Sequence, residues 1–240
     1  MKHLLILFLA VLSAGSNTVD DGGCICDVSP SGHTANCEYR NLTSVPDCVP
    51  HEVQMLLVSG NPLLLNEETF HRFENLTKLI MRKVNGVNTH LPGNLFSGNP
   101  YIEWISMGWN NLKSLPNNLF AGLLWLKNLD LWANELTEIP LAVRTTTSLE
   151  ILTLDRNKIE TLDVEMLAPL SSLKRLSLRR NPLRCDCGLQ PVFQWAQERN
   201  VTHVLTAQCE TPDSLQGRTL LYAFSSMDCE LSNDLALNLV

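Results

Sequence analysis

The sequence has few basic side chains and no long apolar stretch in its interior. Its 18 lysines and arginines face 25 aspartates and glutamates, which leaves a net charge of −7. This deficit makes the chain a poor candidate for nucleic-acid binding, which depends on neutralising phosphates with basic side chains. No stretch reaches the roughly 18 apolar residues of a membrane span. We therefore expect a mature chain without a membrane span and without a nucleic-acid partner.

The motifs that mark common catalytic sites are absent as well. The sequence contains no Gly-x-Ser-x-Gly, no His-Glu-x-x-His and no Gly-x-x-x-x-Gly-Lys. Cysteine is absent between Cys48 and Cys185, and the eight cysteines form one group of four near each end. We expect all eight in disulfides, so that no thiol nucleophile is left. The sequence predicts a protein that is not an enzyme and that holds neither a metal nor a cofactor.

Residues 1–16 have the layout of a secretory signal peptide. A basic start at Lys2 precedes an unbroken apolar run from Leu4 to Leu12, and small residues follow. Secretion would place the cysteines in an oxidising compartment, where disulfides are the default. Three Asn-x-Thr triplets predict glycosylation at Asn41, Asn75 and Asn200. Residues 231–240 form a short tail, too short and polar for an anchor signal. We expect a secreted, extracellular protein.

The centre of the chain, residues 53–180, repeats one apolar pattern. Residues 126–136 have the form Leu-x-x-Leu-x-Leu-x-x-Asn-x-Leu, and five further copies match it more or less closely. The copies are 23 to 26 residues apart and begin near Val53, Leu76, Ile102, Leu126, Leu149 and Leu173. Such self-similarity predicts a solenoid, and the pattern resembles that of leucine-rich repeats. We expect an α/β solenoid, a leucine-rich repeat horseshoe with a concave parallel β-sheet.

The spacing within a repeat has a physical reason. Residues two apart on a strand share a face, so positions 4 and 6 of each copy point into the core and positions 3 and 5 point out. The asparagine at position 9 can bond backbone groups of its own and neighbouring turns, which would otherwise be buried and unpaired. A second apolar set, such as Phe70 and Phe73, closes the coil on the far side. In the second copy the asparagine comes one place late, at Asn85, which predicts a local bulge.

A solenoid exposes its core at both ends, so its terminal units must be atypical caps. The cysteine-rich segments 17–52 and 181–230 resemble the N-terminal and C-terminal caps of secreted leucine-rich repeat proteins. That resemblance implies the pairs Cys185–Cys209 and Cys187–Cys229. In the N-terminal cap the usual early cysteine is missing and Cys48 is extra; the remaining pattern suggests Cys24–Cys37 and Cys26–Cys48. Four cysteines allow three pairings, and a thiolate zinc site is the alternative in each group.

The candidate binding residues are those that point out of the concave face. Trp104, Trp109 and Trp132 are expected there on adjacent strands, within roughly 5–10 Å of one another. Exposed tryptophans beside arginines are typical of binding sites, although these rings could also pack on one another and only stiffen the sheet. Trp125 and Trp195 are interpreted as core residues. The remaining candidates are charged: Arg82, Lys83, Asp130, Asp155, Arg156, Arg175, Arg179 and Arg180.

The last repeat reverses the sign of the overall charge. Lys174, Arg175, Arg179, Arg180 and Arg184 lie in or just after it. Such a patch could bind an acidic protein loop, a sulfated sugar or a microbial surface polymer, or it could be a solvated face that balances the acidic caps.

The plan of cap, repeats and cap resembles the variable lymphocyte receptors, which bind antigen through concave strand positions. The resemblance implies a variable lymphocyte receptor-like protein that recognises microbial surface components, a glycan, a lipid or a protein, on its concave face. The alternative is an extracellular adaptor or inhibitor with one soluble protein partner, such as a matrix protein, a growth factor or an enzyme. We expect a monomer or a weak dimer.

Overall fold

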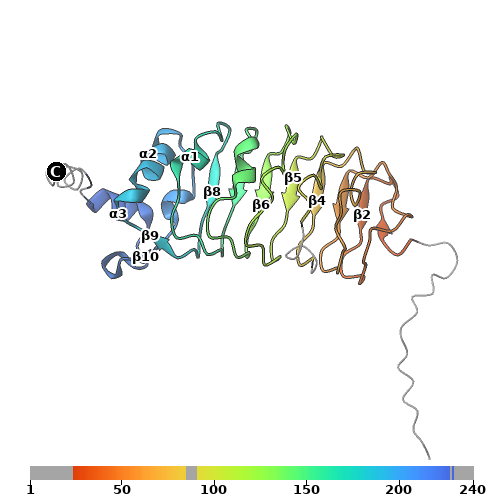
Figure 1. The fold of residues 1–240 in the computed structure, drawn as a ribbon, viewed down its shortest axis with the longest axis horizontal. Helices are drawn as coiled ribbons and strands as arrows, with labels where there is room; N and C mark the ends of the chain where they lie inside the picture. The colour runs from red at the N-terminus through yellow and green to blue at the C-terminus, as the bar shows by residue number, and fades with distance from the viewer. Residues whose placement is uncertain (1–23, 85–90, 228, 230–240) are drawn as a thin grey trace, which may run out of the picture.

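The computed structural model describes residues 24–84, 91–227 and 229. Eight strands form one sheet in chain order: β1 (Asp27–Val28), β2 (Thr34–Asn36), β3 (Met55–Leu57), β4 (Lys78–Ile80), β5 (Trp104–Ser106), β6 (Asn128–Asp130), β7 (Ile151–Thr153) and β8 (Arg175–Ser177). Strands β2 to β8 are parallel, and β1 pairs with β2 antiparallel. Figure 1 shows them side by side along the long axis of the molecule. The predicted α/β solenoid, a leucine-rich repeat horseshoe with disulfides near both ends, is confirmed.

The register of the sheet places equivalent repeat positions beside one another. Met55 pairs with Lys78, and the same row continues through Trp104, Asn128, Ile151 and Arg175. The middle residue of every one of these strands is buried, because it points into the coil. On the far side of the coil the rings of Phe70, Phe96 and Phe120 stack at centroid distances of 6.2 Å. The apolar core therefore runs the length of the solenoid between the strands and this spine.

Buried asparagines at position 9 join each coil to the one before it. Asn134 accepts hydrogen bonds from the backbone N–H groups of Asn110 and Leu112 and donates to the carbonyls of Met107 and Leu131. Asn61, Asn110, Asn157 and Asn181 make equivalent bonds. These bonds satisfy backbone groups that the turns would otherwise leave buried and unpaired. The predicted role of these asparagines is confirmed.

The residue at position 8 of each repeat has a left-handed backbone conformation, and in five of the six repeats the next residue is one of these asparagines. At position 8 the φ angles lie between 52° and 70°, at Gly60, Lys83, Trp109, Ala133, Arg156 and Arg180. Side chains other than glycine rarely adopt this conformation, and it persists because the asparagine bonds fix the turn on both sides. It also directs the side chains of Lys83, Trp109, Arg156 and Arg180 outward, where all four are exposed.

The N-terminal cap corrects the predicted disulfide pairing. The bonds are Cys26–Cys37 and Cys24–Cys48, not Cys24–Cys37 and Cys26–Cys48. The reason is the register of the β1–β2 hairpin, in which Asp27 lies opposite Asn36. One step further along, Cys26 lies opposite Cys37 with a Cα–Cα distance of 4.4 Å, and Cys24 is left to pair with Cys48. Through β2 this cap also adds a parallel strand to the repeats.

The C-terminal cap closes the other end with a small sheet and short helices. It contains β9 (Leu183–Arg184), β10 (Cys209–Thr211), α2 (Gln190–Glu198), α3 (Leu220–Ser226) and the 3-10 helices η2 (Cys187–Leu189), η3 (Val204–Thr206) and η4 (Asp213–Leu215). The bonds Cys185–Cys209 and Cys187–Cys229 are those that the resemblance implied. Trp195 of α2 is buried, as expected. Two further helices, η1 (Leu141–Thr145) and α1 (Val164–Leu167), lie on coils of the repeats.

Trp125 corrects a second expectation, because it is 55% exposed and not in the core. It occupies a tight turn just before Leu126, whose backbone N–H bonds the carbonyl of Leu123. The turn sends Leu126 inward and leaves the preceding side chain outside. The predicted signal peptide, the bulge at Asn85 and the tail at 231–240 lie outside the described residues. Within the described ranges, no helix combines the length and apolar character that crossing a membrane requires.

Candidate functional site

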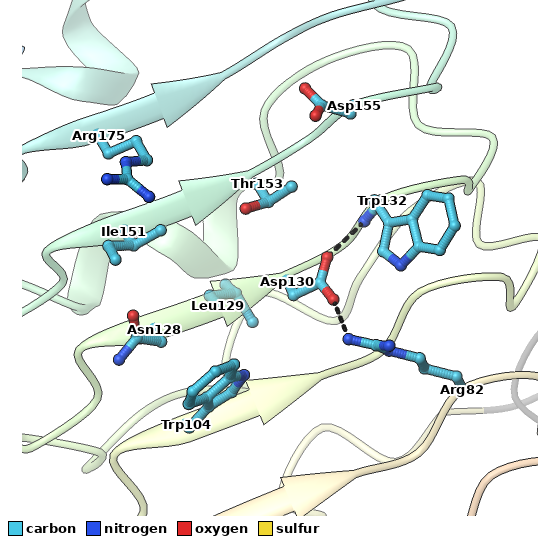
Figure 2. Close-up of a pocket in the computed structure, with 10 residues that line it drawn as sticks. All are labelled: Arg82, Trp104, Asn128, Leu129, Asp130, Trp132, Ile151, Thr153, Asp155 and Arg175. Carbon is cyan, nitrogen blue, oxygen red and sulfur yellow. Dashed lines mark hydrogen bonds and ion pairs between the residues drawn. The ribbon is translucent and has the colours of Figure 1, made fainter. Parts of the chain in front are cut away.

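The outward face of the sheet is hollowed between two tryptophans. Figure 2 shows Trp104 at one side of this hollow and Trp132 at the other, with Asp130 between them. The open volume is about 440 Å³, and we call this region the concave hollow. Its lining comes from the four strands β5 to β8 and from the turns after β4, β6 and β7: Arg82, Trp104, Asn128, Leu129, Asp130, Trp132, Ile151, Thr153, Asp155 and Arg175.

Two of the three candidate tryptophans form a pair. The rings of Trp109 and Trp132 meet edge to face, with a centroid distance of 5.4 Å and an interplanar angle of 88°. Trp132 lies over Gly108, where any Cβ would stand 2.5 Å from the indole nitrogen. Trp104 belongs to the other side of the hollow and makes no ring contact with the pair in the described chain. The expected cluster of three is therefore a pair and a single ring, with Trp104 38% and Trp109 44% exposed.

Each of these rings has a basic side chain against it. The Lys78 ammonium lies 3.9 Å from the centroid of Trp104, and that of Lys83 lies 5.5 Å from the ring of Trp109. The Arg156 guanidinium lies 5.8 Å from the ring of Trp132. Cations at these distances are attracted to the negative face of the ring, so the rings are held in place while part of their surface stays open.

Asp130 is the best-connected acidic group of the hollow. It accepts hydrogen bonds from the guanidinium of Arg82 at 2.9 Å and from the hydroxyl of Ser106 at 2.7 Å. Its second oxygen accepts a hydrogen bond from the backbone N–H of Trp132 at 3.2 Å. Figure 2 shows the contacts of Asp130 with Arg82 and with Trp132. Arg82 also donates to Ser106 at 2.6 Å. The carboxylate is therefore already satisfied by the protein and fixes one wall of the hollow.

The second carboxylate, Asp155, is also engaged. It accepts hydrogen bonds from the Ser177 hydroxyl at 2.6 Å and from the backbone N–H of Arg179 at 2.8 Å. By contrast, the side chains of Asn128, Thr153 and Arg175 make no hydrogen bond or ion pair with the described residues. The groups left open to a ligand are thus mainly donors, between two apolar ring surfaces.

Several basic groups at the C-terminal side of the sheet have no acidic partner. Lys174 pairs with Glu150 and Arg184 with Asp186. No ion pair within the described part of the chain involves Arg156, Arg175, Arg179 or Arg180, nor does one involve Lys83, which lies further toward the N-terminal end after β4. This end of the face is therefore positive, although the chain as a whole carries a net charge of −7.

The predicted candidates divide into two groups. Six line the concave hollow: Arg82, Trp104, Asp130, Trp132, Asp155 and Arg175. The other five lie beside it, at the turns where the strands end: Lys83, Trp109, Arg156, Arg179 and Arg180. The predicted site did not include Asn128, Ile151 and Thr153, although they hold the outward positions 3 and 5. It also did not include Leu129, because its position 4 is expected to point into the core. Among the described residues there is no group of three or more side chains suited to a metal ion.

Sequence comparison agrees with the fold. The family described as leucine rich repeat matches residues 124–183. The chain is 28% identical to transforming growth factor beta activator LRRC33 of Danio rerio over 76% of this chain and 27% of that protein. It is 26% identical to trophoblast glycoprotein of Macaca fascicularis over 93% of this chain and 71% of that protein. Human Toll-like receptor 5 is 29% identical over 59% of this chain and 16% of the receptor.

Structural comparison gives the same result. The crystal structure of human trophoblast glycoprotein has a TM-score of 0.52 at 24% identity, covering 88% of this chain and 98% of that one. A leucine-rich repeat protein of Leptospira interrogans has a TM-score of 0.55 at 25% identity, and the match covers 65% of this chain and 39% of that one. This chain therefore has the leucine-rich repeat fold with disulfide-bonded caps, and the proteins that it resembles include Toll-like receptors.

Proposed function

We propose that this leucine-rich repeat protein is a secreted, non-catalytic recognition protein that binds microbial surface components in the concave hollow. The observation that carries the proposal is the hollow itself, which combines exposed tryptophan surface with polar side chains that have no partner among the described residues. None of these side chains is needed to fill the core. Exposed aromatic surface beside arginines is the composition of binding hot spots.

The chemistry of the hollow indicates the class of ligand. Asp130 and Asp155 are occupied by bonds within the protein, so the groups that can meet a ligand are Arg175, Asn128 and Thr153. A ligand with acceptor oxygens or negative charges would satisfy these donors, and the ring surfaces of Trp104 and Trp132 suit apolar faces. Acidic polysaccharides of microbial surfaces combine both features.

An extracellular location is part of this proposal. The apolar run at residues 4–12, the four disulfides and the exposed side chains of Asn41, Asn75 and Asn200 support it. The similarity to Toll-like receptors supports a role in innate immunity, and the variable lymphocyte receptors offer a model for binding on the concave face.

A second candidate is an extracellular adaptor or inhibitor that binds one soluble protein. The similarity to a protein named as an activator of transforming growth factor beta favours it. An acidic loop of such a protein would also satisfy the unpaired arginines. The two candidates differ in the ligand and share the hollow.

The test is a capture experiment with the purified secreted protein. Wild type and the Trp109→Ala/Trp132→Ala variant are incubated with whole bacteria, with purified cell-wall polymers and with fluid from the source organism. We expect microbial material to retain the wild type. The captured amount of the variant should be at least about tenfold lower, because hot-spot residues contribute about 2 kcal/mol or more to the free energy of binding. The melting temperature should stay close to that of the wild type.

A matched control is Trp125→Ala, which removes a tryptophan of similar exposure outside the hollow. It should leave capture unchanged. Retention of a single soluble protein, with no binding to microbial material, would overturn the microbial proposal in favour of the adaptor. Capture that is insensitive to Trp109 and Trp132 would exclude the tryptophan pair as part of the binding site.

A further inference from the structure

A second exposed apolar surface lies outside the concave hollow, in the turns that lead into the strands. In three successive coils the backbone N–H groups of Leu76, Ile102 and Leu126 bond the carbonyls three residues earlier, at 3.0 to 3.3 Å. These identical turns leave the residue before each strand-leading leucine or isoleucine exposed, and those residues are Asn75, Tyr101 and Trp125. Since neighbouring coils are about 5 Å apart, the three side chains form a column.

Two members of this column and one neighbour form an apolar strip. Tyr101 is 55%, Leu124 71% and Trp125 55% exposed. None of them lines the concave hollow. In the next two coils the equivalent place is held by Ser148 and Ser172, so the strip ends there. Several large exposed apolar side chains on neighbouring coils are a candidate binding surface.

A predicted glycosylation site lies at the other end of the strip. Asn75 begins the acceptor triplet Asn75-Leu76-Thr77, its side chain is exposed, and it stands one coil from Tyr101 and two coils from Trp125. The second distance is about 10 Å, within reach of the innermost sugars of an N-linked glycan. The C–H groups on the apolar face of a sugar ring are attracted to the negative face of an aromatic ring.

We propose that the N-linked glycan on Asn75 lies along Tyr101, Leu124 and Trp125 and covers this strip. The inference rests on the proposed extracellular function, because the modification requires passage through the secretory route. The glycan would shield this apolar strip from nonspecific contact with other molecules and leave the concave hollow as the exposed aromatic site.

The test uses protein secreted from animal cells, with occupancy of each triplet measured by mass spectrometry. The folded glycoprotein is treated with an amidase that releases N-linked glycans, and oxidative labelling of side chains is compared before and after. We expect labelling of Tyr101 and Trp125 to rise several-fold, while labelling of Trp104 in the concave hollow stays constant. An unoccupied Asn75, or labelling that release leaves unchanged, would overturn the proposal.

Two variants assign the effect to this glycan. Asn75→Gln should reproduce the increase in labelling, and Asn200→Gln, which removes a triplet in the C-terminal cap, should not. Conversely, Trp125→Ser should speed enzymatic release of the glycan from Asn75 but not from Asn200. Glycans at Asn41 or Asn200 with none at Asn75 would refute this inference alone. A protein that is retained in cells without any glycan would contradict the extracellular function.

Discussion

Asn134 satisfies four backbone groups on two adjacent coils and is almost completely buried. We predict that Asn134→Ala lowers the free energy of unfolding by about 3 kcal/mol or more, because each buried group left unpaired costs about 1–3 kcal/mol. Urea denaturation measures the loss. The exposed Asn117→Ala should change stability by less than about 0.5 kcal/mol. A loss under about 1 kcal/mol at Asn134 would show that water replaces the bonds.

The absence of a side chain at Gly108 leaves the space that the indole of Trp132 occupies. A Cβ at this position would stand 2.5 Å from Cδ1 and Nε1 of Trp132, so Gly108→Ala must displace the indole from Trp109. We expect a changed near-ultraviolet circular dichroism signal and a loss of ligand capture similar to that of Trp132→Ala. An unaltered spectrum with intact capture would mean that the pair tolerates the displacement.

Individual residues were predictable where the repeat alone decides their direction. Trp109 and Trp132 hold positions 8 and 7, which leave the coil, so the sequence placed them outside. Trp125 was misassigned, because the motif says nothing of the turn before position 1. The bond between Arg82 and Asp130 joins side chains 48 residues apart in sequence and depends on the rotamers of three coils, which a motif cannot specify.

Opposite charges alternate along one column of strand-leading residues. At position 2, Lys127 pairs with Glu103 at 3.0 Å and Lys174 with Glu150 at 2.7 Å. A further pair, Glu135 with Lys158, links two turns at 2.7 Å. The hydrogen bond from Lys174 is the main cause that lowers the pKa of Glu150, and the bond from Lys158 does the same for the pKa of Glu135.

These lowered pKa values give the acid dependence a sign. A carboxyl with a lower pKa in the folded state stabilises the fold above its unfolded pKa, and that contribution is lost as the pH falls through the folded pKa. We predict that Glu135→Gln/Glu150→Gln reduces the drop in melting temperature between about pH 5 and pH 3. The effect should be small and weakened by salt, because both carboxylates are partly open to solvent.

The control for this measurement is Glu160→Gln. Glu160 is exposed, and its side chain forms no ion pair with any described residue. Its replacement should leave the acid dependence of the melting temperature as in the wild type. Parallel curves for the double variant and the wild type would mean that the two pairs add nothing to stability.

The N-terminal hairpin shows what a family resemblance can miss at the scale of an element. Carrying over a cysteine pattern with one member missing and one added gave the wrong pairs. The turn residues Pro30, Ser31 and Gly32 between two short segments were a local signal for a hairpin, and its register brings Cys26 opposite Cys37. In the C-terminal cap no cysteine departs from the family pattern, and the implied pairs agree with the structure.

For the whole molecule, the caps hold the ends of a core that would otherwise meet water. The Cys187–Cys229 bond closes a loop of 42 residues and secures α3, whose Phe224 contacts Phe193 of α2 at 5.1 Å. We predict that Cys187→Ala/Cys229→Ala lowers the free energy of unfolding by about 4 kcal/mol, from the loop entropy of the unfolded chain. Quenching of Trp195 fluorescence by acrylamide should increase as α3 loosens.

The Cys24–Cys48 disulfide in the N-terminal cap provides the control for this variant. Cys24→Ala/Cys48→Ala should lower stability too, but it should leave the quenching of Trp195 unchanged, because that side chain is buried in the opposite cap. Increased quenching in both variants would mean that the caps communicate through the repeats. The solenoid itself was predictable from periodicity, whereas the addition of β1 and β2 to its sheet was not, since the cap carries no copy of the motif.

The asparagine bonds give the solenoid a direction. Asn157 reaches back to the carbonyl of Leu131 and the N–H of Leu136, so each turn is completed by the coil that follows it. A coil that loses its successor loses the asparagine that bonds its turn. A coil that loses its predecessor keeps its own turn bonded by the following asparagine, although it loses sheet bonds such as that from the N–H of Ile151 to the carbonyl of Lys127. Shortening the protein from its two ends is therefore not equivalent, and a chain that emerges from the ribosome N-terminus first completes each turn only when the next coil has been made.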